Sequence, residues 1–122
     1  MSQDETDQVF DAGALDSLLE IIGGDRDALV DLIGSFLDEG PGLIGRIESA
    51  VRDEDPEALR QAAHTMKSSA ADFGAMELSR LCREMEALGH AGRTDGATAL
   101  SLRAVAAWQA AAVALRGYMK GW

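Results

Sequence analysis

Near the middle of the chain the sequence reads Ala63-His64-Thr65-Met66-Lys67-Ser68-Ser69-Ala70-Ala71-Asp72-Phe73-Gly74-Ala75. Apolar side chains recur in and just before this segment at steps of three and four residues, at Leu59, Ala63, Met66, Ala70 and Phe73. This period is typical of an amphipathic helix whose apolar stripe faces a protein core. Gly74 is expected to have a structural role, as the residue that ends the helix and turns the chain.

The opposite face of the same helix is polar and carries one of the two histidines of the chain. A helical wheel places on this face Arg60, His64, Lys67, Ser68 and Ala71. Lys67 follows His64 by three residues, so the two side chains are neighbours on the helix surface. An exposed imidazole beside an ammonium group is suited to receiving an anionic group, such as a phosphoryl group.

Length and composition favour a single all-α domain. The chain has 122 residues, of which 47% are hydrophobic and two are proline. Such a chain can bury one core, and its many alanines and leucines favour helices. Apolar periodicity and turn residues predict helices over residues 9–22, 25–39, 41–51, 56–72, 75–88 and 95–118, with a break at Gly40-Pro41.

These elements predict an antiparallel, up-down four-helix bundle with one or two additional short helices. Residues 1–8 are expected to be a flexible acidic tail, and residues 9–122 a single helical domain. Leu32, Leu102 and Trp108 are assigned to the core by their helical spacing. Cys82 is likewise predicted to be a small core residue, and His90 to lie in a solvent-exposed loop without a role.

The formal net charge of −10 excludes several partners. Nucleic acids and anionic membranes need clustered lysine and arginine, so neither is an expected partner. The single cysteine permits no intramolecular disulfide and no zinc knuckle. The polar start of the chain does not resemble a signal peptide, and no apolar run reaches the roughly 18 residues of a spanning helix. A soluble, cytoplasmic monomer is the expectation.

Enzyme classes that need a recognisable motif are not supported. The sequence has no glycine-rich phosphate loop, no pair of histidines at metal spacing and no Glu-x-x-His pair. The chain is too short to include the nucleotide-binding domain of a histidine kinase. Thr65 also stands where the dimerisation helix of such a kinase usually has an acidic residue.

The segment from Ala63 to Leu88 resembles the histidine-containing phosphotransfer (HPt) domain family of phosphorelays. The family signature is roughly A-H-x-L-K-G-x-x-x-x-x-G-A followed by L-x-x-x-C-x-x-L-E. This sequence has Ala63-His64-Thr65-Met66-Lys67-Ser68, then Gly74-Ala75, then Leu78 to Glu86 with Cys82 between them. The resemblance extends upstream to Gly23-Gly24-Asp25 and covers the chain apart from its first residues.

The resemblance implies a role for each matching residue. His64 would be the phosphoacceptor, whose Nε2 attacks an aspartyl phosphate on a partner, and Lys67 would offset the charge of the phosphoryl oxygens. The implied partners are response-regulator receiver domains and a hybrid histidine kinase. Mg²⁺ would belong to the receiver domain, so no metal or other cofactor is expected on this chain. The protein would be a phosphorelay intermediate that passes phosphate between receivers, without ATP-dependent or hydrolytic activity.

Ser68 departs from the family pattern, which has glycine at this position. The hydroxymethyl group lies one turn from His64, where it could donate to a phosphoryl oxygen, have no effect or slow docking. This departure keeps one alternative open, a phosphorylation-independent helical adaptor that binds or sequesters a receiver domain.

The docking surface is expected to surround His64. On the histidine-bearing helix it would consist of Arg60, Gln61, Lys67, Ser68 and Ala71. The first helix has more apolar residues than one stripe requires, and the resemblance places it nearby. Leu18, Ile21 and Ile22 are therefore predicted to add an apolar patch for the partner.

Overall fold

The computed structural model of the protein describes residues 10–121, so the whole of the predicted acidic tail, residues 1–8, and Trp122 lie outside the described residues. This part of the chain forms five helices and no strand. They are α2 (Ala12–Ile21), α3 (Arg26–Arg52), α4 (Pro56–Asp72), α5 (Met76–His90) and α6 (Ala97–Lys120).

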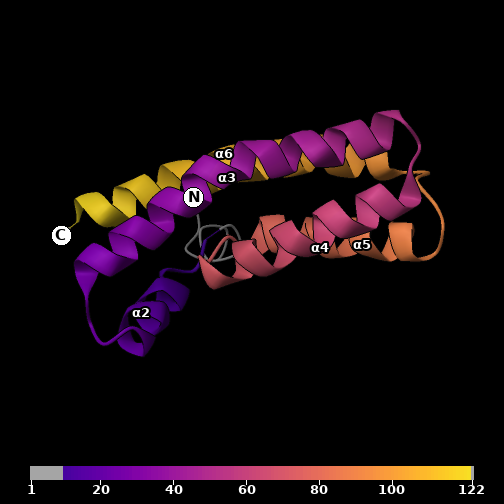
Figure 1. Cartoon of the computed structure of the whole chain (residues 1–122). Helices are drawn as coiled ribbons and strands as arrows, with labels where there is room; N and C mark the ends of the chain where they lie inside the picture. The colour runs from indigo at the N-terminus through magenta and orange to yellow at the C-terminus, as the bar shows by residue number, and fades with distance from the viewer. Residues whose placement is uncertain (1–9, 122) are drawn as a thin grey trace.

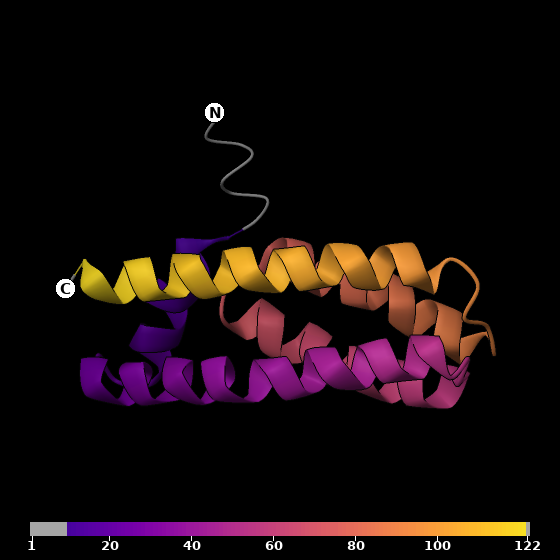
Figure 2. The same cartoon turned by 90° about the horizontal axis from the view of Figure 1, so that it is seen from above.

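The four long helices form the predicted antiparallel bundle (Figure 1). Helix α3 packs against α4 and α6, and α5 packs against the same two helices. Figure 2, turned by 90°, shows α3 and α6 running alongside each other for most of their length. The short helix α2 packs on α3 and α4 at one end of the bundle, where it is the predicted additional helix.

Aspartates stand at the N-terminal ends of three of the helices. The side chains of Asp11, Asp25 and Asp55 accept hydrogen bonds from backbone N–H groups in the first turns of α2, α3 and α4. Each bond satisfies a donor that has no partner within its helix. Pro56 follows Asp55 in the first turn of α4, where a proline costs no hydrogen bond.

The predicted break at Gly40-Pro41 is wrong, because α3 runs without interruption from Arg26 to Arg52. Pro41 is exposed, and its missing N–H leaves the carbonyl oxygen of Leu37 without its helical hydrogen bond. Gly40 is buried against Trp108 of α6, and a Cβ atom there would lie 2.0 Å from the indole ring. The packing of α3 on α6 therefore overrides the local preference for a helix end.

The core follows the predicted stripes with two exceptions. Leu59, Met66 and Trp108 are buried, and Phe36 stacks on Phe73 with ring centroids 4.7 Å apart. Leu102 is 66% exposed and Leu32 is 39% exposed, so neither belongs to the core. Helix α6 has alanine on several sides, and apolar spacing alone does not determine which side faces inward.

Two further details concern the last helices. His90 is exposed as predicted, but it is the last residue of α5 rather than part of a loop. Helix α6 is the one helix in residues 10–121 that is long and apolar enough to cross a membrane. It packs along α3 and α5, with Ala104, Ala111 and Leu115 fully buried.

Candidate functional site

Helix α4 presents His64 to solvent as its apolar spacing predicts. Ala63 and Met66, on either side of it in the sequence, are fully buried, whereas the His64 side chain is 57% exposed. Lys67 lies one turn later with 28% of its side chain exposed. The backbone therefore aims the imidazole outward, and the lysine lies at the edge of the packed surface.

The carboxylate of Glu86 on α5 connects these two side chains. Its Oε2 lies 2.6 Å from Nδ1 of His64, and its Oε1 accepts a hydrogen bond of 2.6 Å from Nζ of Lys67. The hydrogen bond from Lys67 and, to a smaller extent, the one from His64 lower the pKa of Glu86 below its ordinary value. Glu86 is therefore ionised at neutral pH.

An ionised carboxylate only accepts hydrogen bonds, so Nδ1 of His64 must carry the proton of this pair. In the neutral imidazole Nε2 then keeps its lone pair. The contact with Glu86 thus fixes both the tautomer and the orientation of the ring. An exposed Nε2 with a free lone pair is a nucleophile, with the Lys67 ammonium close by.

Sequence reasoning assigned no role to Glu86. The residue ends the Leu78–Glu86 part of the family pattern, and that pattern is the signal that could have identified it. Helical periodicity could not, because it relates residues on one helix and says nothing of which residue of α5 faces His64 on α4. The separation of 22 residues becomes contact only when the two helices pack.

Two close contacts hold α4 and α5 together on either side of the His64–Glu86 pair. The hydroxyl of Ser79, a buried residue of α5, donates a 3.0 Å hydrogen bond to the backbone carbonyl of Lys67. Gly89 lies against the backbone of α4, where a Cβ atom would be 2.5 Å from the Pro56 carbonyl oxygen. These contacts fix the register at which Glu86 meets His64.

The other predicted docking residues of α4 are arranged around His64. Arg60 is half-buried and donates two hydrogen bonds to Glu57, which also accepts one from the amide of Gln61. Ser68 and Ala71 are exposed. These residues and Lys67 share the solvent side of α4 with His64, which leaves the surface around the imidazole open.

Helix α2 lies next to the C-terminal half of α4. The Asp11 N–H donates a 2.7 Å hydrogen bond to the carbonyl of Gly74, directly after α4. Gly74 has φ +78°, and a Cβ atom there would lie 2.3 Å from the Asp11 carbonyl oxygen. Glycine is therefore required both for the turn and for the seating of α2.

The predicted apolar patch on α2 is partly exposed. Ile21 is 80% exposed, whereas Leu18 and Ile22 are partly buried against the core. Ile21 is therefore a surface residue whose side chain does not contribute to the core.

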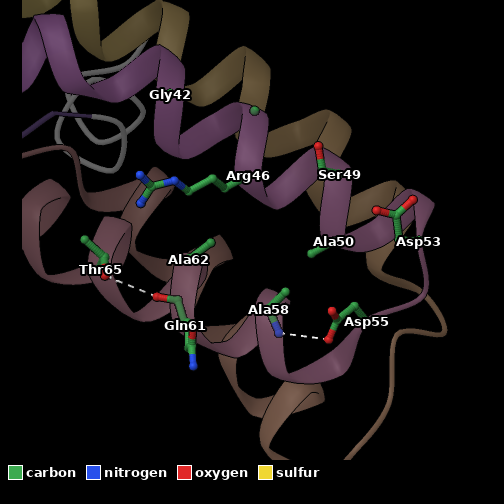
Figure 3. A pocket seen from close by; sticks show the side chains of 11 residues that line it. Gly42, Arg46, Ser49, Ala50, Asp53, Asp55, Ala58, Gln61, Ala62 and Thr65 are labelled. Carbon is green, nitrogen blue, oxygen red and sulfur yellow. Dashed lines mark hydrogen bonds between the residues drawn. The ribbon is translucent and has the colours of Figure 1, made fainter.

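A hollow between α3 and α4 lies on the other flank of α4 (Figure 3). Gly42 and Arg46 from α3 and Gln61 and Thr65 from α4 contribute to its walls, but His64 and Lys67 do not. In Figure 3 the Thr65 hydroxyl bonds to the backbone oxygen of Gln61, a contact of 3.2 Å within the helix. This hollow therefore does not include His64, Lys67 or Glu86.

Within residues 10–121, neither a metal cluster nor a reactive thiol accompanies the site. Residues 10–121 contain no group of three or more His, Cys, Asp or Glu side chains that could hold a metal ion. Cys82 is buried in the core as predicted, and burial, with a smaller contribution from Glu86, raises the pKa of its thiol to about 12. A thiol of this kind stays protonated and packs as a small apolar group.

Comparison with known proteins identifies the family. The sequence matches the Hpt domain family over residues 31–118. The structure matches the crystal structure of histidine-containing phosphotransfer protein B (HptB) from Pseudomonas aeruginosa PAO1 with a TM-score of 0.84. The two sequences are 23% identical, and the match covers 93% of this chain and 96% of the other, so it shows a common fold. A search of curated proteins by sequence gave no match. The chain belongs to the Hpt domain family and has a histidine phosphotransfer role in a phosphorelay.

Proposed function

We propose that His64 is the phosphoacceptor of this protein and that it receives a phosphoryl group from an aspartyl phosphate on a receiver domain. It then passes the group to the aspartate of another receiver domain. The observation that carries this proposal is the hydrogen bond between Nδ1 of His64 and Glu86, which leaves the lone pair on Nε2 of a side chain that is 57% exposed.

The transfer step needs little covalent chemistry from the protein. The Nε2 lone pair attacks phosphorus, the bond between phosphorus and the aspartyl oxygen breaks, and the aspartate leaves as a carboxylate. Nδ1 keeps its proton, so the phosphorylated ring is an imidazolium that stays paired with Glu86. The negative charge of Glu86 stabilises this cation, and the same interaction holds the ring in place before the attack.

Lys67 supplies positive charge beside the transferred group. Its ammonium keeps a hydrogen bond to Oε1 of Glu86, which fixes its position while two further N–H donors remain for phosphoryl oxygens. Removing one charge-assisted hydrogen bond of this kind costs about 1.5–3 kcal/mol. We therefore assign Lys67 to stabilisation of the transition state and of the phosphohistidine.

The partner completes the reaction centre. The Mg²⁺ ion required for aspartyl phosphate chemistry belongs to the receiver domain, and this chain contributes the nucleophile and the docking surface. The protein acts as a soluble cytoplasmic monomer, has no ATP-dependent or hydrolytic activity of its own, and docks receivers of response regulators and of a hybrid kinase around His64.

A small phosphodonor tests this proposal without a partner. Incubation with phosphoramidate should form a phosphorus–nitrogen bond to His64 and release ammonia. The label should be acid-labile and base-stable, and it should disappear in His64→Gln but persist in His90→Gln. Label that persists in His64→Gln would refute the site. A receiver that binds the protein yet never exchanges label with it would favour the adaptor function instead.

A further inference from the structure

A surface hollow lined by two arginines lies beside the His64–Glu86 pair. Arg83, Glu86, Ala87 and His90 follow one face of α5, and together with Arg60 of α4 they line a shallow surface hollow. Glu86 belongs both to this hollow and to the contact with His64. The hollow therefore adjoins the site at which the phosphoryl group is transferred.

Arg83 differs from the other two cations near His64. Lys67 is bound to Glu86, and Arg60 donates two hydrogen bonds to Glu57. Arg83 is exposed and has no hydrogen bond or ion pair with any residue between 10 and 121. An external anion can therefore bind Arg83 without first displacing an internal partner, which would cost part of the binding energy.

The geometry of phosphoryl transfer brings a partner over this hollow. Nε2 of His64 must reach the phosphorus atom of the donor, so the partner surface is in contact with α4 and α5 around the ring. A standard interface buries about 800 Å² on each side, which is a patch of roughly 16 Å radius. Arg83 lies only one helical turn from Glu86, about 4.5 Å along the axis of α5. Arg83 is thus inside that patch.

The charge of the hollow indicates what the partner brings. The whole chain has a net charge of −10, yet at this position Glu57 and Glu86 pair with Arg60 and Lys67, so the charge of Arg83 is not offset by an ion pair within residues 10–121. An aspartyl phosphate is itself anionic, and the residues that hold its metal ion are carboxylates. A guanidinium binds a carboxylate through two parallel hydrogen bonds, a geometry that lysine does not reproduce.

We propose that Arg83 is a specificity-determining residue that binds an acidic side chain on the rim of the receiver domain's phosphorylation site. This inference rests on the proposed function of His64. Arg83 anchors the partner on the α5 side of the imidazole, and it takes no part in the transfer chemistry.

Matched charge reversals test this assignment. Arg83→Glu and Arg116→Glu each change the net charge by the same amount, and Arg116 is an exposed residue of α6, which packs on α5 and α3 rather than on α4. The partner used is the receiver domain, among those encoded in the same genome, that takes label from the phosphorylated protein fastest. Arg83→Glu should raise the receiver concentration for half-maximal transfer at least ten-fold, and Arg116→Glu less than two-fold. For Arg83→Lys, the receiver concentration for half-maximal transfer should lie between the values for the wild type and for Arg83→Glu.

Phosphorylation by phosphoramidate separates this inference from the proposed function. The rate for Arg83→Glu should stay within two-fold of the wild type, because Arg83 does not contact the reacting atoms. If the wild type takes no label on His64, the proposed function fails. If it takes label but the two charge reversals weaken receiver transfer equally, the role of Arg83 alone is refuted. A strong loss of phosphoramidate labelling in a folded Arg83→Glu protein also refutes the role of Arg83. If Arg83→Glu does not fold, Arg83→Gln is used in its place.

Discussion

Oε2 of Glu86 lies 2.6 Å from Nδ1 of His64, across the packed surface between α5 and α4. The second carboxylate oxygen binds Lys67, so one acidic residue positions both the nucleophile and the cation. A free histidine in water exchanges between two tautomers and many orientations. Here a single contact from a neighbouring helix selects the tautomer with the lone pair on Nε2.

Replacing Glu86 by alanine should slow phosphorylation of His64 by phosphoramidate by about ten- to a hundred-fold, the typical cost of losing the group that orients a functional histidine. The ring loses its acceptor, and Lys67 loses the partner that holds it. Glu84→Ala is the matched control, because Glu84 lies on the same helix and, within residues 10–121, forms its ion pair with Arg80, at 3.5 Å, rather than with His64 or Lys67. Equal rates for the two variants would contradict the role assigned to Glu86.

The orientation of His64 was predictable from sequence, but its surroundings were not. The stripe that includes Leu59 and Met66 determines which side of α4 is buried, and therefore that His64 faces water. Glu86 and Ser79 act across a helix interface, and helical periodicity contains no information about how two helices are rotated against each other. The family pattern includes Glu86, and the packing of α5 on α4 shows that this residue contacts His64 and Lys67.

Local signals also failed where packing opposes them. Gly40-Pro41 is a strong signal for a helix end, yet α3 continues because Gly40 lets the helix approach Trp108. The helical spacing of Leu102 predicts a core residue, but α6 is apolar on several sides, and only its contact with α3 and α5 decides which side is buried.

Substituting Ile21 by glutamate should weaken binding of a receiver domain without unfolding the protein. The side chain is 80% exposed, so a charge there costs little in the free protein but would be placed in an apolar contact of the complex. Isothermal titration should show a loss of about ten-fold or more in affinity, whereas circular dichroism should show an unchanged melting temperature. Val113→Glu on α6, where the native residue is 69% exposed, should leave affinity unchanged. Equal affinities for both variants would remove α2 from the docking surface.

Restoring the family glycine at residue 68 should leave phosphotransfer within a few-fold. Ser68 is exposed and has no hydrogen bond with any described residue, so removing its hydroxymethyl group breaks no contact. The glycine should lower the free energy of unfolding by about 0.5 kcal/mol through its weaker helix propensity. Stopped-flow transfer to a receiver is the measurement, and a change of more than ten-fold in either direction would show that Ser68 takes part in docking or transfer.

Alanine substitutions at two glycines of α3 should change the free energy of unfolding in opposite directions. A Cβ atom at Gly40 would meet Trp108 at 2.0 Å, so Gly40→Ala should destabilise the protein by about 1–3 kcal/mol through overpacking. A Cβ atom at Gly45 would meet no atom of another helix within 4 Å among residues 10–121. Gly45→Ala should therefore stabilise the protein by about 0.5–1 kcal/mol through helix propensity. Urea unfolding of both variants measures the difference, and a stabilising Gly40→Ala would contradict the close contact of α3 with α6.

The position of the phosphoryl group on the imidazole shows whether Nε2 of His64 is the nucleophile. The protein is phosphorylated with phosphoramidate, and the ring nitrogens are examined by ¹⁵N and ³¹P nuclear magnetic resonance. We expect a phosphorus–nitrogen bond at Nε2 of His64, with Nδ1 still protonated and paired with Glu86. A phosphoryl group on Nδ1 of His64, or on His90 in place of His64, would contradict the account.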